Sequence, residues 1–205
     1  MTRRRQCPTC LRAHTACICH WVTSVNNQVE VVVLQHPKEV DHAKGSARLL
    51  HLSLQHSQLV VGDVFDTVVL QDLLTGSPGA VRHTLLLYPE LPQDLASGLA
   101  AAPVLSVAGL ADPTTLRLVV LDGTWRKSRK MLFQNPLLQQ LPRLTLGDLA
   151  PSRYLIRKAR RPDQRSTLEA ACAALSQLEC NASKYQPLLT AFDGFVAQHA
   201  ANRHR

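Results

Sequence analysis

Uninterrupted runs of apolar residues recur along the chain, and they predict strands that are buried on both faces. Such runs are typical of parallel sheets, in which helices cover both surfaces. Each run is closed by a Pro, Gly or Asp that limits its length. The predicted strands are Val29 to Leu34, His83 to Tyr88, Pro103 to Val107 and Leu116 to Leu121, with a shorter one near Arg143 to Leu146.

Helical spacing of apolar residues predicts helices between and after these strands. We expect helices at about residues 43–59, 125–140 and 185–199, and another that begins at Ser166. Ser166-Thr167-Leu168-Glu169 has the form of a capping box, in which the Ser and Glu side chains bind backbone N–H groups. Because strands alternate with helices, the predicted fold class is α/β with a largely parallel sheet.

Composition indicates a soluble, globular protein that is either one large domain or one domain with a small appendage. The 205 residues are 45% apolar and 19% charged, without a long apolar segment, so no membrane span is expected. The N-terminal segment Met1 to Arg5 contains three Arg residues and precedes Cys7-Pro8-Thr9-Cys10 rather than an apolar stretch. This arrangement argues against a signal peptide and favours the cytoplasm. The net charge of +8 predicts a polyanionic partner, and no obligate protein partner is expected.

Four of the six cysteines lie close together near the N-terminus. The pattern C-x2-C-x6-C-x-C is formed by Cys7, Cys10, Cys17 and Cys19. These residues supply the four thiolates of a tetrahedral, structural zinc site. An iron–sulfur cluster and reduced cysteine pairs are the alternatives, and His14 and His20 are spare ligands. Cys172 and Cys180 are expected to be packing residues.

The last long apolar run ends in an acidic turn that is followed by a basic helix. Asp122-Gly123-Thr124-Trp125 places a carboxylate at the end of a strand, where ligands bind in open α/β sheets. One helical face offers cations to phosphate, whereas Trp125, Ser128 and Leu132 share a face that is expected to pack. In the alternative, Asp122 or Thr124 is only a helix N-cap and the cations are a solvated face. The candidate RNA-binding cations are Arg126, Lys127, Arg129 and Lys130.

A second group of cations precedes the capping box. The segment from Arg153 to Arg165 has six Arg or Lys residues against one acid, Asp163. A charge run is usually a solvated surface, yet its place beside the turn at Ser166 favours contact with RNA phosphates. The RNA-binding residues expected here are Arg153, Arg157, Lys158, Arg160 and Arg161.

Together these motifs resemble those of the DTW-domain family. Asp122-Gly123-Thr124-Trp125 matches the D-x-T-W signature of the family, and the cysteine set fits as well. The likeness spans nearly the whole chain and is strongest to the bacterial tRNA-uridine aminocarboxypropyltransferases of the family. Three further blocks resemble those of the family in the same order: His36-Pro37-Lys38-Glu39, Leu87-Tyr88-Pro89-Glu90 and Ser166-Thr167-Leu168-Glu169-Ala170.

The resemblance implies a SPOUT-like fold with a C-terminal trefoil knot, and S-adenosylmethionine as co-substrate. It implies a zinc-binding knuckle at residues 1–25 and a catalytic domain at residues 26–205. The sequence contains no G-x-G, which agrees, because a Rossmann cofactor site requires that motif. The implied cofactor-binding residues are Leu87, Tyr88, Pro89, Leu121, Asp122, Gly123, Thr124, Ser166, Thr167 and Glu169.

The reaction implied by the resemblance is transfer of an aminocarboxypropyl group to N3 of a variable-loop uridine of tRNA, with release of methylthioadenosine. Asp122 is the candidate catalytic base for the N3 proton, or else it holds the amino group of the co-substrate. The capping box explains Glu169 without a catalytic role, and structural roles are expected for His36 and Glu39. The rival functions are a SPOUT-like RNA methyltransferase and a non-catalytic, zinc-bearing RNA-binding module.

Overall fold

A five-stranded parallel sheet forms the centre of the computed structural model, which describes residues 6–76, 82–91, 94, 96, 98–99, 101–104, 110–146 and 165–201. The strand order is β2-β1-β4-β3-β5, and all described pairs are parallel. The predicted α/β class with a parallel sheet is therefore confirmed. The strands are β1 (Glu30–Gln35), β2 (Ser57–Val61), β3 (His83–Leu87), β4 (Leu116–Asp122) and β5 (Arg143–Leu144).

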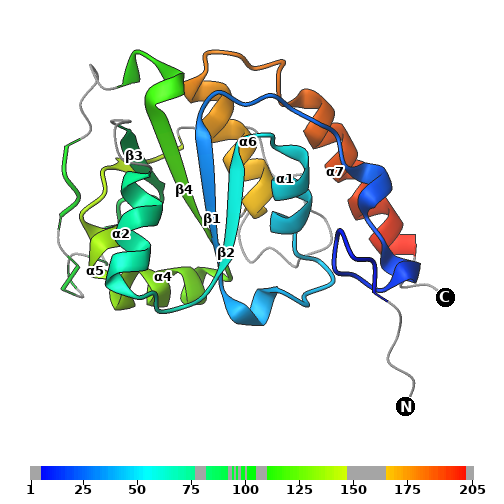
Figure 1. Ribbon diagram of the computed structural model, residues 1–205, viewed down its shortest axis with the longest axis horizontal. Coiled ribbons are helices and arrows are strands. Elements are labelled where there is room, and N and C mark those ends of the chain that lie inside the picture. Colours follow the sequence, from blue (N-terminus) through cyan, green and yellow to red (C-terminus); the bar gives the residue numbers. More distant parts are fainter. Residues whose placement is uncertain are drawn as a thin grey trace.

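Helices cover both faces of the sheet (Figure 1). One face packs against α1 (Ala47–Ser53), α6 (Thr167–Leu178) and α7 (Gln186–Ala201). The other packs against α2 (Thr67–Thr75), α4 (Trp125–Gln134) and α5 (Pro136–Gln139). Short 3-10 helices lie at His14–Ala16, Cys19–Trp21, Pro37–Glu39 and Pro113–Thr115. Within the described ranges, each helix is too short or too polar to span a bilayer.

The central strands are buried on both faces, which explains their uninterrupted apolar runs. In β1, Val31 and Val33 belong to the core beneath α1, α6 and α7, whereas Val32 and Leu34 belong to the core beneath α2, α4 and α5. All seven residues of β4 are buried. The strand predictions for β1, β3, β4 and β5 are confirmed, with ends that differ by one or two residues.

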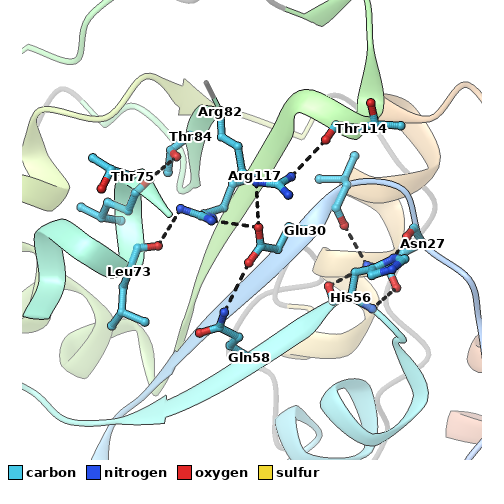
Figure 2. Close-up of polar contacts among 12 residues, drawn as sticks. Asn27, Glu30, His56, Gln58, Leu73, Thr75, Arg82, Thr84, Thr114 and Arg117 are labelled. Atoms are coloured by element: carbon cyan, nitrogen blue, oxygen red, sulfur yellow. Dashed lines mark hydrogen bonds and ion pairs between the residues drawn. The ribbon is translucent and has the colours of Figure 1, made fainter. Parts of the chain in front are cut away.

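The helix predicted at about residues 43–59 is wrong in its second half. α1 ends at Ser53, and β2 follows as an edge strand beside β1. The fully buried Asn27 holds the entry to β2, because its amide donates to the carbonyl oxygen of His56 at 2.8 Å and accepts from the His56 N–H at 3.0 Å (Figure 2). Pairing with β1 therefore decides the course of a segment whose local pattern is helical.

Three further elements differ from the predictions. The basic helix breaks into α4 and α5 at Asn135, because Pro136 has no N–H for the helical ladder. Helix α2, which begins after its N-cap Asp66, has no counterpart among the predicted helices. The strand predicted at Pro103 to Val107 is wrong where it can be compared, since residues 103 and 104 form no strand and Val104 is 94% exposed. Residues 105–107 lie outside the described residues.

The N-terminal cysteine segment docks on α7 and on the loop before α1 (Figure 1). Arg12 donates to two carbonyl oxygens of that loop at 2.6 and 2.7 Å, and its guanidinium lies 5.1 Å from the centre of the Phe195 ring. Trp21 packs against Gly194 in α7, where an added Cβ would come within 2.2 Å of the indole. A glycine inside the helix therefore makes room for Trp21.

A buried ion pair neutralises charge at the amino end of the sheet (Figure 2). Arg117 in β4 is 3% exposed, and it donates to the Glu30 carboxylate at 2.8 Å and to the Leu73 carbonyl oxygen at 2.9 Å. Arg82 lies 3.2 Å from the same carboxylate. Gly76 has a φ of 78°, and a Cβ there would lie 2.4 Å from the Arg117 guanidinium. The space and the backbone conformation both require glycine at this position.

We expect Glu30→Gln to lower the free energy of unfolding by about 3 kcal/mol, because it leaves the buried Arg117 charge without a full counter-charge. Urea unfolding followed by circular dichroism measures this change. Asp41→Asn makes the same charge change at an exposed position and should alter stability by less than about 0.5 kcal/mol. Equal effects of the two substitutions would contradict a structural role for the ion pair.

Candidate functional site

The carboxyl ends of β1 and β4, here called the switch point, lie side by side at the centre of the sheet. After β1 the chain continues to α1 on one face, and after β4 it enters α4 on the opposite face. Open α/β sheets bind ligands where neighbouring connections diverge in this way. The register pairs Gln35, the last residue of β1, with Asp122, the last residue of β4. The structure therefore places Asp122 where a ligand is expected.

The Asp122 carboxylate is buried and accepts a side-chain hydrogen bond on both of its oxygens. Thr167 Oγ1, at the start of α6, donates to Oδ1 at 2.6 Å, and Gln35 Nε2 donates to Oδ2 at 2.8 Å. Asp122 is 5% exposed, and its own carbonyl oxygen accepts from the His36 N–H at 2.9 Å. These donors fix the orientation of the carboxylate, whose oxygens can each accept more than one hydrogen bond. The two predicted residues Asp122 and Thr167 are thus brought together.

The capping box predicted at the start of α6 is confirmed. Ser166 Oγ accepts from the Glu169 N–H at 3.2 Å, and the Glu169 carboxylate accepts from the Ser166 N–H at 2.9 Å. Ser46 Oγ accepts from the Leu168 N–H at 3.2 Å. The Thr167 N–H is the first-turn donor that has no partner among the described residues. Glu169 therefore caps the amino end of α6, which is the structural role predicted for it from the sequence.

An aromatic pair joins the end of β3 to the start of α4. Tyr88 is 3% exposed and stacks on Trp125, with ring centres 5.1 Å apart and planes 12° from parallel. Burial raises the pKa of Tyr88, as does the nearby Asp94 carboxylate, and the Arg143 guanidinium lies 5.1 Å from the Tyr88 ring. Trp125 is 45% exposed. It therefore lies at the surface rather than in the core with the rest of its predicted face.

The other residues of the predicted cofactor cradle are partly used for packing. Leu121 belongs to the core beneath α2 and α4, whereas Leu87 and Pro89 are half-buried around the end of β3. Thr124 is the N-cap of α4. This is the role that the sequence analysis gave as the alternative to ligand binding. A Cβ on Gly123 would lie 3.1 Å from a side chain in the first turn of α4. Glycine therefore permits the tight entry into the helix.

Two of the α4 cations that were expected to bind phosphate are engaged within the protein. Lys127 Nζ lies 2.8 Å from the carboxylate of Glu39, which is 2% exposed. Arg129 Nε lies 2.8 Å from the carboxylate of Asp94, which is 3% exposed. A buried carboxylate without a partner is costly, so both cations have a structural role.

Arg126 and Lys130 are the α4 cations that face solvent. Arg126 is exposed, and no ion pair joins it to a residue that the structure describes. The Lys130 side chain is 58% exposed and lies 3.9 Å from Asp63. The RNA-binding residues expected in the second basic segment lie outside the described residues: Arg153, Arg157, Lys158, Arg160 and Arg161.

His36 holds the backbone just beyond the switch point. Its Nδ1 accepts from the Lys38 N–H at 3.1 Å, which caps the 3-10 helix Pro37–Glu39. Burial lowers the pKa of His36, and the Lys127 charge lowers it further. The imidazole is therefore neutral near pH 7, with its proton on Nε2.

The four predicted metal ligands converge. Their Sγ atoms lie within 4.8 Å of one another, with 3.5 Å between Cys7 and Cys19 and 3.8 Å between Cys10 and Cys17. Thiolates about 2.3 Å from a tetrahedral zinc ion stand about 3.8 Å apart, so the cluster fits such an ion. Backbone N–H groups of Cys10 and Thr9 lower the pKa of Cys7 to about 6, whereas burial raises that of Cys19 to about 12. A metal ion therefore has to displace the proton of Cys19.

The family model described as DTW domain matches residues 4–200 of the chain. The chain belongs to the DTW-domain family. The sequence resemblance carried by Asp122-Gly123-Thr124-Trp125 and the cysteine set is thus confirmed over nearly the full length. No solved structure gives a significant match.

Several proteins of similar sequence are named tRNA-uridine aminocarboxypropyltransferase. The protein called tRNA-uridine aminocarboxypropyltransferase 2 in Drosophila melanogaster is 32% identical over 197 residues, which cover 91% of this chain and 72% of that protein. Its namesake in Mus musculus is 29% identical over 209 residues, which cover 97% and 66%. The tRNA-uridine aminocarboxypropyltransferase A of Arabidopsis thaliana is 28% identical over 138 residues, which cover 63% and 51%.

Gln35 is the residue of the switch point that the sequence predictions missed. It is the last residue of the first apolar run and directly precedes His36-Pro37. A polar residue at the carboxyl end of a buried strand was a usable signal, since ligands bind at that end. Only the register between β1 and β4 shows that this residue meets Asp122.

We expect the purified protein to hold about one zinc ion per chain and Cys10→Ser to release it, because three thiolates remain. Elemental mass spectrometry measures the metal, and thermal unfolding with and without a chelator measures its effect on stability. Metal loss should lower the melting temperature, because metal binding and folding are coupled. Cys180 is exposed, so its predicted packing role is wrong, whereas Cys172 is buried as predicted. Cys180→Ser lies outside the cluster and should therefore keep the metal. Full zinc content in Cys10→Ser would contradict the assignment.

Proposed function

We propose that this protein is a tRNA-uridine aminocarboxypropyltransferase that uses S-adenosylmethionine as co-substrate. It transfers the 3-amino-3-carboxypropyl group to N3 of a variable-loop uridine and releases methylthioadenosine. The observation that carries the proposal is the buried Asp122 carboxylate, which Gln35 and Thr167 orient at the switch point. Membership of the DTW-domain family and the names of the relatives supply the reaction class.

The proposed reaction exchanges one bond at the γ-carbon of the methionine moiety. The N3–Cγ bond forms while the Cγ–S bond breaks, and the electron pair of the broken bond neutralises the sulfonium sulfur of the departing methylthioadenosine. The N3 proton passes to a base. Because the sulfonium is already a good leaving group, the protein supplies position and proton acceptance.

Asp122 is the proposed acceptor of the N3 proton. Its carboxylate is the acidic group at the switch point, and its two side-chain donors hold it in one orientation. The proposed co-substrate cradle surrounds it with the end of β3 at Leu87 to Pro89, the turn at Leu121 to Thr124, and the start of α6 at Ser166 to Glu169. A base already in place avoids the cost of ordering it during the reaction.

The proposed macromolecular partner is tRNA, without an obligate protein partner. The net charge of +8 favours a polyanion, and Arg126 and Lys130 offer cations beside the switch point. The basic segment from Arg153 to Arg161 adds five cations by sequence. The exposed part of the Trp125 ring, next to Arg126, offers a surface on which a base can stack.

We also propose the knotted, SPOUT-like topology that the family resemblance implies, and zinc as the structural metal of the cysteine cluster. In this proposal residues 1–25 are a knuckle that docks on the catalytic domain of residues 26–205. The contacts of Arg12 with the loop before α1 and of Trp21 with α7 support that arrangement.

Wild-type protein incubated with unmodified tRNA and S-adenosylmethionine should produce aminocarboxypropyl-uridine and methylthioadenosine, both detected by mass spectrometry. Asp122→Asn should slow this reaction by about 100-fold or more, because loss of a general base typically costs that much, while tRNA binding is retained. Asp112→Asn makes the same change at the N-cap of the 3-10 helix Pro113–Thr115, which precedes β4, and is the matched control. A methylated base with S-adenosylhomocysteine would identify a methyltransferase instead, and tRNA binding without product would favour the non-catalytic module.

A combined Arg126→Gln and Lys130→Gln variant should bind tRNA more weakly than wild type. The slope of log affinity against log salt should fall by about one for each phosphate contact that is lost. Fluorescence anisotropy of labelled tRNA at several salt concentrations measures the slope. Arg48→Gln, in α1 on the opposite face of the sheet, is the control and should leave it unchanged. An unchanged slope in the combined variant would exclude α4 from the RNA interface.

A further inference from the structure

Gln35 carries a buried acceptor that has no partner in the described part of the chain. The residue is 3% exposed at the end of β1, and its Oε1 makes no hydrogen bond to a residue that the structure describes. A buried polar group without a partner destabilises the folded state, so each such group calls for an explanation. Oε1 is the sole acceptor of this side chain. It belongs to the same amide group as Nε2, which donates to the Asp122 carboxylate.

The bond to Asp122 determines which way the Gln35 amide faces. An ionised carboxylate only accepts hydrogen bonds, so the amide nitrogen has to be the atom 2.8 Å from Asp122 Oδ2. A rotation of the amide by half a turn would set two acceptors against each other. The Gln35 carbonyl oxygen therefore points away from Asp122, at a place where a nearby negative charge favours a cationic donor.

We propose that Gln35 Oε1 accepts a hydrogen bond from the α-ammonium group of S-adenosylmethionine, an inference that rests on the proposed function. An ammonium offers three N–H donors, and a hydrogen bond from a charged donor to a carbonyl oxygen is stronger than one from a neutral donor. The uridine N3–H is a poorer match, because its proton has to leave and an amide carbonyl is too weak a base to take it. Gln35 thus binds the amino group and leaves Asp122 for the proton of N3.

The carboxylate of the same amino-acid group has a suitable donor nearby. The Thr167 N–H opens α6 without a partner among the described residues, and its hydroxyl is bonded to the other oxygen of Asp122. A helix N-terminus favours an anion through its free N–H and its dipole. A zwitterion held at both of its charges presents its γ-carbon in one fixed position, which transfer from that carbon requires.

The test compares S-adenosylhomocysteine with its deaminated analogue, which keeps the carboxylate but lacks the amino group. In calorimetric titrations of the wild-type protein, the analogue should bind about 10–100-fold more weakly, the range expected for a hydrogen bond to a charged group. Gln35→Met keeps the length of the side chain and removes the acceptor, so this variant should bind both ligands with nearly the same affinity. Gln35→Leu is a second apolar replacement should the first variant unfold.

Thr167→Val is the matched control for an indirect effect through Asp122. It removes the other donor to that carboxylate and leaves the Gln35 carbonyl in place, so it should keep the preference for the amino-bearing ligand. A full preference in Gln35→Met, or an equal loss of affinity for both ligands, overturns the proposal. Equal binding of the two ligands by the wild type overturns it as well. Failure of the wild type to bind either ligand refutes the proposed function itself, and the two failures are therefore distinguishable.

Discussion

The pairing of β1 with β4 brings together the residues on which the site depends. In this register Gln35 lies opposite Asp122, although 87 positions separate them in the sequence. The register is held by apolar side chains on both faces of the two strands, in two separate cores. A slip of one residue would turn each of these side chains to the opposite face. Hydrophobic packing along the two strands therefore fixes where the polar residues Gln35 and Asp122 lie at the strand ends.

The carboxylates at the two ends of the sheet have different kinds of partner. At the amino end, Arg117 and Arg82 share the Glu30 carboxylate, so that opposite charges neutralise each other where the chain is buried. At the carboxyl end, the donors to Asp122 from Gln35 and Thr167 are neutral groups. The first arrangement favours stability, because a buried charge without a partner is costly. The second places the Gln35 carbonyl oxygen, which has no hydrogen-bond partner among the described residues, beside a buried carboxylate.

The cysteine segment is held in place by contacts with the rest of the chain. Cys7 and Cys10 are themselves buried in the core that contains α7. Arg12 and Trp21 make the outer contacts, and Gly194 provides the space that Trp21 occupies. A segment this short buries too little apolar surface to order itself, so its docking surface helps to fix it, and a metal bound by the four cysteines would do the same.

Local patterns in the sequence determined much of the fold and part of the site. Uninterrupted apolar runs located β1, β3 and β4, because a strand buried on both faces has no polar position to interrupt it. The capping box at Ser166 and the cysteine spacing were also readable, because each involves groups that lie a few residues apart. Asp122 was found because it ends such a run, at the end of the strand where ligands bind.

Only the tertiary structure decided which distant groups meet. The segment that became β2 has a helical pattern, and its pairing with β1 overrode that pattern. Lys127 and Arg129 belong to one basic run by sequence, yet each is paired with a buried carboxylate from another part of the chain. Gln35 gains its significance from the strand beside it. In each case the deciding energy comes from burial and pairing across long sequence separations, which a local pattern does not contain.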